Sequence, residues 1–239
     1  MLIIEPKKLV KTISRRELAK KIDHTLLKPN VTLSQLEKTC IESRNYGFAA
    51  CVIPAFFVER AVKLLKESDV KVATVIGFPH GNLTTKAKLA DTREVLEKGA
   101  REIDMVLNIS ALKSGLYDFV KWEISEIVDL AKDYDAVIKV IIETAYLTDD
   151  EKVKAAVIVK EAGAHYVKTS TGFAGVGATV HDVLLLKRAV GEFPKIKAAG
   201  GIRHLEDALI MIFVGAERIG TSSGVRIMEE YDKLVNSLK

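Results

Sequence analysis

The sequence predicts an eight-fold (β/α) barrel of the TIM type, in the α/β class. Between residues 22 and 237, near-continuous apolar segments alternate eight times with amphipathic ones. Such alternation indicates a parallel sheet whose outer face is covered by helices, and eight units are typical of the closed barrel. A doubly wound open sheet is the alternative. It is less favoured because no Gly-x-Gly-x-x-Gly follows the first predicted strand.

The first 21 residues predict a helical extension in front of the barrel. Ser14 with Glu17 three residues later is a capping-box pattern, which predicts a helix over Ser14–Lys21. No linker or low-complexity segment interrupts the remaining chain. Because barrels of this kind reach about 250 residues as one unit, we expect residues 1–239 to form a single domain.

Strands and helices follow in regular order after this extension. Apolar, β-branched runs that end at Pro, Gly, Asn or Glu predict strands at 22–27, 48–53, 70–76, 102–107, 136–142, from 165 through Lys168, at 195–199 and at 217–219. Helical periodicity with N-cap residues and glycine stops predicts helices at 32–46, from 55 to about 67, at 84–98, 117–134, 148–161, 179–190 and 205–213, and to about 237.

Composition restricts the class of protein. Hydrophobic residues make up 48% and charged residues 28% of the chain, and the formal net charge is +4. This charge suits anionic small molecules, whereas nucleic acid would require a clustered basic stripe. With two cysteines, no apolar run of about 18 residues and no signal-peptide pattern, we expect a cytoplasmic protein without a membrane partner.

Lys168 stands where the sixth predicted strand should remain apolar. A buried lysine tends to lose its proton, and a neutral amine is a nucleophile. The alternative is a strand-end lysine that reaches solvent. The hydroxyls and glycine that follow, including Thr171 and Gly172, suit a loop that approaches a polar ligand.

Asp104 and Lys197 are predicted to join Lys168 inside the barrel. Side chains alternate along a strand, so Asp104 faces away from the outward Ile103, and Lys197 faces away from Ile196. Two neighbouring lysines repel as cations, which lowers the pKa of one amine. We interpret the three residues as a catalytic cluster; a structural ion pair is the alternative.

Glycine and serine clusters after the last two strands indicate a phosphate cradle. Barrels often bind phosphate with these loops and a helix N-terminus. The candidates are Gly200, Gly201, Gly220, Ser222 and Ser223. Ordinary capping and tight turns are the alternative explanation.

Other polar residues give weaker signals. The five histidines lack a metal-binding spacing, so no metal is expected. No cofactor is expected either. Lys139 and Glu143 share one strand face and are left open as a structural pair or as support for the site. Cys51 is expected to be a small core residue, and a position beside the pocket is left open.

Seven segments together resemble the deoxyribose-phosphate aldolase family. They are IDHTLLKP (22–29), GFPHG (77–81), EIDMVLN (102–108), VIIE (140–143), VKTSTG (167–172), KAAGGIR (197–203) and RIGTSS (218–223). The resemblance spans roughly residues 18–237. It implies a metal-free class I aldolase that cleaves 2-deoxy-D-ribose 5-phosphate reversibly into acetaldehyde and D-glyceraldehyde 3-phosphate.

The resemblance also implies roles for individual residues. Lys168 would form the Schiff base, Asp104 would relay protons, and Lys197 would perturb the nucleophile. The residues that match the phosphate cradle or line the pocket are Gly172, Gly200, Gly201, Gly220, Ser222, Ser223, Asp23, Thr25 and Cys51. The partners would be phosphosugar and aldehyde substrates, and we expect a homodimer or homotetramer.

Two departures and two alternatives accompany this interpretation. Some family members carry a lysine where this chain has Phe173, and some end in a tyrosine that this chain lacks. Another phosphosugar aldolase or isomerase on the same barrel is the first alternative. A non-catalytic protein that binds a phosphosugar is the second.

Overall fold

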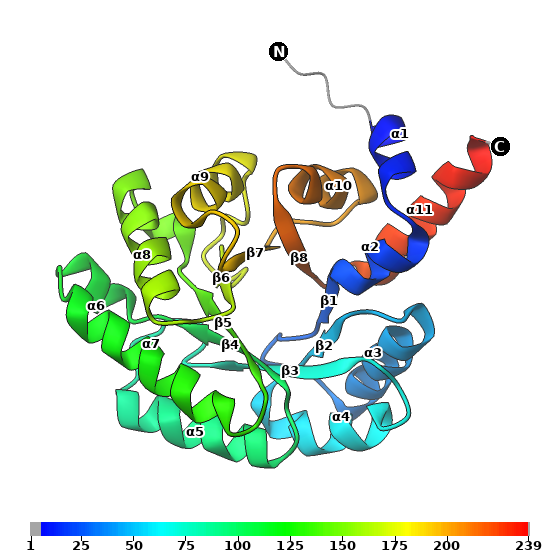
Figure 1. The fold of residues 1–239 in the computed structure, drawn as a ribbon. Coiled ribbons are helices and arrows are strands. Elements are labelled where there is room, and N and C mark those ends of the chain that lie inside the picture. Colours follow the sequence, from blue (N-terminus) through cyan, green and yellow to red (C-terminus); the bar gives the residue numbers. More distant parts are fainter. Residues whose placement is uncertain (1–5, 239) are drawn as a thin grey trace.

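Eight parallel strands form a closed barrel in the computed structural model, which describes residues 6–238. Each strand pairs with the next one along the chain, and β8 pairs with β1 to close the ring (Figure 1). The strands are β1 (Ile22–Thr25), β2 (Ala50–Val52), β3 (Lys71–Ile76), β4 (Glu102–Val106), β5 (Val137–Ile141), β6 (Tyr166–Lys168), β7 (Lys195–Ala199) and β8 (Ala216–Thr221). The predicted barrel is thereby confirmed, and the open sheet is not formed.

Helices surround the barrel and cover the outer face of the sheet (Figure 1). They are α3 (Leu33–Tyr46), α4 (Val58–Leu65), α5 (Thr85–Glu97), α6 (Ile109–Lys113), α7 (Tyr117–Lys132), α8 (Asp149–Glu161), α9 (Val180–Val190), α10 (Leu205–Phe213) and α11 (Gly224–Ser237). Two 3-10 turns, η2 (Ala55–Phe57) and η3 (Thr144–Tyr146), lie in loops after β2 and β5. Most predicted boundaries agree with these bounds to within about two residues.

An N-terminal extension precedes β1, as predicted, although residues 1–5 lie outside the described part. It comprises α1 (Pro6–Leu9), the 3-10 turn η1 (Val10–Thr12) and α2 (Arg15–Lys21). The predicted capping box is present: Ser14 caps α2 and the Glu17 carboxylate accepts its backbone N–H at 2.7 Å. The Tyr231 hydroxyl of α11 donates to the Ile13 carbonyl at 2.9 Å, so the extension is fastened to the last helix.

The apolar core lies mainly between the strands and the helices. Outward side chains such as Ile103, Met105 and Val140 are fully buried in this layer. A much smaller apolar group inside the barrel contains Ala50, Val52 and Ala73, on β2 and β3. Charged side chains from the other six strands occupy the rest of the barrel interior, and this arrangement positions the site.

Two local features differ from the prediction. The short helix α6 was not expected; Asn108 caps it by accepting the Ala111 N–H at 3.0 Å. Strand β2 is shorter at both ends than the predicted 48–53, and after Pro54 the chain enters η2. Within residues 6–238, none of the helices combines the length and the apolar composition that crossing a membrane requires.

Candidate active site

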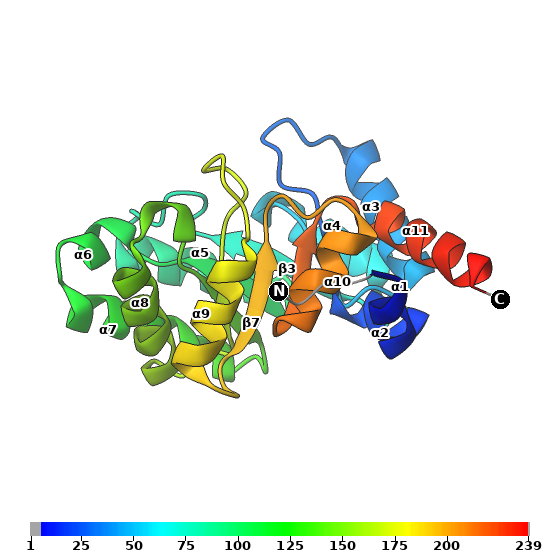
Figure 2. The ribbon, with the colours of Figure 1, turned by 90° about the horizontal axis from the view of Figure 1, so that it is seen from above.

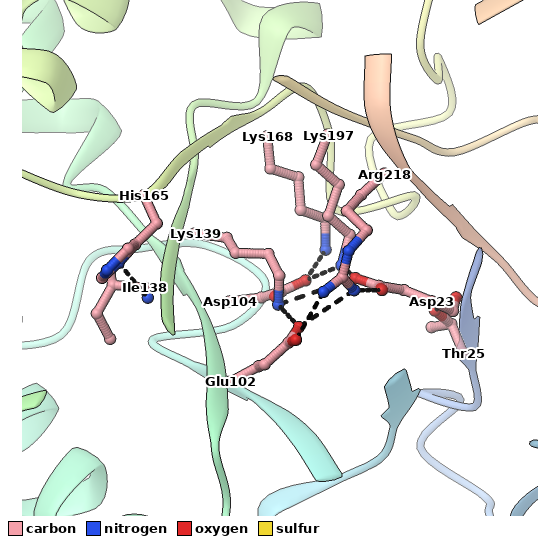
Figure 3. Close-up of polar contacts among 10 residues, drawn as sticks. All are labelled: Asp23, Thr25, Glu102, Asp104, Ile138, Lys139, His165, Lys168, Lys197 and Arg218. Atoms are coloured by element: carbon pink, nitrogen blue, oxygen red, sulfur yellow. Dashed lines mark hydrogen bonds and ion pairs between the residues drawn. The ribbon is translucent and has the colours of Figure 1, made fainter. Parts of the chain in front are cut away.

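The three predicted catalytic residues meet inside the barrel. Lys168 ends β6 and lies directly opposite Lys197 of β7, and both side chains point inward, as does Asp104 of β4 (Figure 3). Lys168 is 3% exposed, and the other two are fully buried. Lys168 therefore does not extend to solvent, which rules out the alternative explanation for this lysine.

One carboxylate oxygen of Asp104 accepts hydrogen bonds from both amines. Lys168 Nζ donates to Asp104 Oδ2 at 2.7 Å, and Lys197 Nζ donates to the same oxygen at 2.6 Å. Lys197 Nζ also donates to Asp23 Oδ2 at 2.5 Å. Asp104 therefore connects the two lysines, and Asp23 holds Lys197 from β1.

A second group of charges lies on the far side of Asp104 from Lys168. Lys139 Nζ donates to Asp104 Oδ1 at 2.9 Å and lies 2.5 Å from Glu102 Oε2. The Arg218 guanidinium donates to Glu102 Oε1 at 2.7 Å and also to Asp23 (Figure 3). Burial of charges is tolerated here because almost every one faces an opposite charge.

The cluster contains one more basic than acidic group. The basic side chains are Lys139, Lys168, Lys197 and Arg218, and the acidic ones are Asp23, Glu102 and Asp104. Three carboxylates can balance only three cations. The cluster is therefore electrically balanced when one basic group has lost its proton, and a net buried charge is costly.

Lys168 is the group whose surroundings favour this loss. Burial, followed by the nearby Lys197 cation, lowers its pKa to about 8, although Asp104 opposes the shift. At pH 7 such an amine is neutral in about one molecule in ten, against about one in several thousand for an ordinary lysine. Lys139 differs: burial disfavours its charge, but Asp104, Glu102 and Asp23 outweigh burial and raise its pKa.

The carboxylates of the cluster remain ionised. Burial alone would raise the pKa of Asp104, but Lys139, Lys168 and Lys197 hold it well below its usual range. In the same way, Lys197 and Arg218 outweigh burial and lower the pKa of Asp23 to about 2. Asp104 is thus a hydrogen-bond acceptor at neutral pH, beside an amine that can lose its proton.

A cavity of about 480 Å³ opens above Lys168 at the carboxyl ends of the strands. This is the end of the barrel where catalytic residues are found in TIM-barrel enzymes. Seven of the other predicted site residues line the cavity, namely Thr25, Thr171, Gly172, Gly200, Gly201, Gly220 and Ser222. None of the described residues that line it is a carboxylate, so the cavity suits an anionic ligand.

Two glycines in the wall are required by close packing. A Cβ at Gly200, where φ is +88°, would lie 2.9 Å from the Cα of Gly177. A Cβ at Gly220 would lie 3.2 Å from Lys197 Cε and 2.9 Å from the Cβ of Ala199. Gly220 thus leaves room for the lysine beneath it.

Glu143 organises the loop after β6. Its carboxylate accepts the Thr171 N–H at 3.1 Å and also the Thr171 hydroxyl hydrogen, and Thr171 Oγ1 in turn accepts the Phe173 N–H at 3.0 Å. Glu143 has φ of +52°, a rare conformation for a side-chain-bearing residue, and is 1% exposed. It therefore supports the cavity wall and does not pair with Lys139, which settles the question left open by the sequence.

Three predicted pocket residues lie outside the cavity wall. Asp23 is fully buried beneath it, within the charged cluster. Ser223 lines a neighbouring groove with His24 and Arg226. Cys51 faces the outer layer, where it packs beside Cys40 of α3. The expectation that Cys51 borders the pocket is therefore wrong, because alternation along β2 turns its side chain outward.

Glu102 and Arg218 were not among the predicted site residues. Alternation could have identified both, since Glu102 precedes Asp104 by two residues and Arg218 stands next to the outward, apolar Ile219. The guanidinium also lies 5.9 Å from the centre of the Tyr166 ring.

The chain is similar in sequence to known aldolases. The model of the DeoC/LacD family of aldolases matches residues 18–230. The chain belongs to this family. Among curated aldolases it is 58% identical to a deoxyribose-phosphate aldolase of Thermoanaerobacter sp. (strain X514), over 91% of this chain and 98% of the other. It is 54% identical to one of Thermococcus gammatolerans, over 89% and 96%.

Solved aldolase structures share the fold. The aldolase QR15 has a TM-score of 0.89 at 43% identity and covers 93% of this chain and 99% of its own. The deoxyribose phosphate aldolase from Aeropyrum pernix, described as a unique tetrameric structure, has a TM-score of 0.88 at 35% identity, over 96% and 97%. The aldolase family thus shares both the sequence and the barrel of this chain.

Proposed function

We propose that this aldolase cleaves 2-deoxy-D-ribose 5-phosphate reversibly into acetaldehyde and D-glyceraldehyde 3-phosphate through a Schiff base on Lys168. The observation that carries the proposal is the position of Lys168. Its amine has a pKa of about 8 and lies at the inner end of the cavity. None of the described residues that line this cavity carries a carboxylate. The relatives named deoxyribose-phosphate aldolase support this choice of substrate.

The proposed chemistry begins with the neutral amine. Lys168 Nζ adds to the aldehyde carbon C1 of the open-chain sugar, and loss of water leaves an iminium ion. Removal of the proton from the C3 hydroxyl then allows the C2–C3 bond to break. The bonding electrons move to the iminium and form an enamine, and the C3 fragment leaves as an aldehyde. Protonation of the enamine at C2 and hydrolysis release acetaldehyde.

Asp104 and Lys197 are proposed to handle the protons. Asp104 Oδ2 lies 2.7 Å from Lys168 Nζ and remains ionised, so it can accept a proton from groups attached to this nitrogen or near it. Lys197 donates to the same oxygen and can return a proton along this path. The cluster stabilises the iminium as well, since the iminium carries the charge that protonated Lys168 would have.

The experiment combines product detection with trapping. The protein is incubated with deoxyribose 5-phosphate and EDTA, acetaldehyde is measured, and borohydride is added to fix the iminium. We expect acetaldehyde release and a covalent adduct on Lys168, both absent in Lys168→Ala. Lys195→Ala is a matched control, because Lys195 lies on the neighbouring strand but is exposed at its far end.

Other outcomes would favour the alternatives. Release of a different aldehyde, or isomerisation without cleavage, would indicate another phosphosugar enzyme. Binding without turnover would indicate a protein that only binds a phosphosugar. An adduct that forms equally in Lys168→Ala would refute the assignment of the nucleophile.

We also propose that the chain acts as one domain and assembles into a homodimer or homotetramer. The tetramer described for the Aeropyrum pernix relative supports self-association. Sedimentation equilibrium tests this proposal: a single species with the mass of one chain, 26.3 kDa, would contradict it.

A further inference from the structure

The outer part of the cavity holds two cations that the proposed chemistry at C1 does not use. Three basic residues line the cavity: Lys28, Lys168 and Arg203. Lys168 Nζ is held by Asp104 at the inner end. Lys28 and Arg203 belong to the loops above, and no carboxylate lies among the described lining residues to neutralise them.

These two residues flank the glycine and serine cradle. Arg203 follows β7, Gly220 and Ser222 belong to the end of β8 and the loop after it, and Lys28 follows β1. Since the barrel order is β7–β8–β1, the β8 loop lies between the loops that carry the two cations (Figure 1). A phosphate group bound at the predicted cradle would therefore have one basic residue on each side.

The backbone around Lys28 is anchored, whereas its side chain is available. The Leu26 N–H donates to the Val52 carbonyl at 2.8 Å, the Lys28 carbonyl accepts the Val31 N–H at 3.3 Å, and Pro29 restricts the turn. Among residues 6–238, no carboxylate forms an ion pair with the exposed Lys28 side chain. Figure 2 shows the β1–α3 loop projecting on the same side as the β6–α9 loop.

The described residues of the β6–α9 loop that line the cavity include no basic side chain. Phe173, on the β6–α9 loop, packs edge to face against Phe78 with ring centres 5.2 Å apart. Both rings are apolar. A phosphate with nearly two negative charges near pH 7 would therefore meet its basic side chains on the side of β7 and β1.

We propose that Lys28 contacts the substrate phosphate and sets the preference of this aldolase for phosphorylated over unphosphorylated sugars. The proposal rests on the proposed function and extends it to a residue of the β1–α3 loop. Lys28 contributes a mobile point charge, while the cradle supplies fixed backbone N–H groups and hydroxyls. Its effect is confined to the phosphate end of the substrate, far from the C2–C3 bond.

The test compares two substrates. For Lys28→Gln we expect kcat/KM with deoxyribose 5-phosphate to fall about tenfold relative to kcat/KM with 2-deoxyribose, through KM. Lys28→Arg should retain most of the preference. Lys38→Gln is the control, because Lys38 lines the neighbouring groove, where it lies 3.8 Å from Glu42. Its ratio should equal that of the wild type.

A second measurement needs no turnover. Inorganic phosphate should protect the wild-type protein against thermal unfolding, and Lys28→Gln should require a higher phosphate concentration for the same protection. An unchanged substrate ratio together with unchanged protection in Lys28→Gln would overturn the inference. Failure of the wild type to cleave either sugar would overturn the proposed function instead, while the phosphate measurement would still report on Lys28.

Discussion

Lys168 and Lys197 are direct partners across neighbouring strands β6 and β7, and their amines share one oxygen of Asp104. When two amines are buried side by side, protonation of one makes protonation of the other less favourable. The other residues of the barrel determine which of the two amines keeps its proton more readily. Lys197 has Asp23 as a second acceptor, whereas Lys168 has Asp104 alone among the described residues and faces the cavity.

Replacing Lys197 should move the pH dependence of the reaction. In Lys197→Met, Lys168 loses a nearby cation, and Asp104 loses a competing donor, so the pKa of Lys168 should rise from about 8 toward its usual value. Since the neutral amine is the reactive form, kcat/KM rises with pH through this pKa, and the midpoint should shift upward by about one unit or more. Borohydride trapping rates measured from pH 6 to 10 check this. A midpoint that stays at the wild-type position would contradict it.

Asp104→Asn should separate imine formation from bond cleavage. The substitution removes a charge that favours protonated Lys168, so the amine becomes neutral more readily. It also removes the proposed proton acceptor, and loss of general acid–base catalysis costs about 10²- to 10⁴-fold. We expect trapping of the sugar to persist while acetaldehyde release falls by this factor. Equal losses in both assays would instead place the main effect of Asp104 on the geometry of Lys168.

Glu102 and Arg218 should be coupled energetically. Removing one partner of a buried ion pair leaves an uncompensated charge and typically costs about 3–5 kcal/mol. Glu102→Gln leaves two carboxylates for four basic groups and should lower the free energy of unfolding by roughly this amount. Arg218→Met removes the surplus basic group and should cost less, and the double variant should lose less than the sum. Urea unfolding of all four proteins measures the coupling. Strict additivity would show that the pair contributes no interaction energy.

Glu143→Ala should loosen the loop that carries Thr171. The carboxylate holds both the N–H and the hydroxyl of Thr171, so its loss should raise KM for deoxyribose 5-phosphate more than it lowers kcat. Glu143→Gln keeps an acceptor oxygen and should recover part of the loss. Lys168 trapping at saturating sugar provides the control, because β6 itself is unchanged. A fall in kcat with unaltered KM would argue against a role in positioning the loop.

The barrel and the central residues were predictable because they depend on local patterns. Apolar runs, caps and alternation are properties of short segments, and they located Asp104, Lys168 and Lys197 correctly. The environment of Lys88 could not be predicted from such local patterns. Lys88 lies on a correctly predicted helix, yet it is fully buried and forms an ion pair with Glu123 of α7 at 2.7 Å. Lys88 and Glu123 are 35 positions apart in the chain, and the residue pattern of neither helix predicts their contact.

Cys51 and the Glu102–Arg218 pair show the same limit in the site itself. The outward direction of Cys51 follows from strand parity, but the resemblance to a family had placed it at the pocket. Glu102 and Arg218 satisfy the parity rule, but their partnership depends on β4 and β8 facing each other across a closed ring. Closure is a property of the whole chain, so only the folded barrel reveals that pairing.

The junction between β1 and β8 joins the first strand of the barrel to the last. During synthesis, Asp23 leaves the ribosome long before Lys197 and Arg218, its partners in the finished barrel. Until those strands are in place, Lys168 lacks both the burial and the Lys197 cation that lower its pKa, so we expect it to be protonated like an ordinary lysine. We therefore expect the proposed Schiff-base amine to become reactive only after the last strand has closed the barrel.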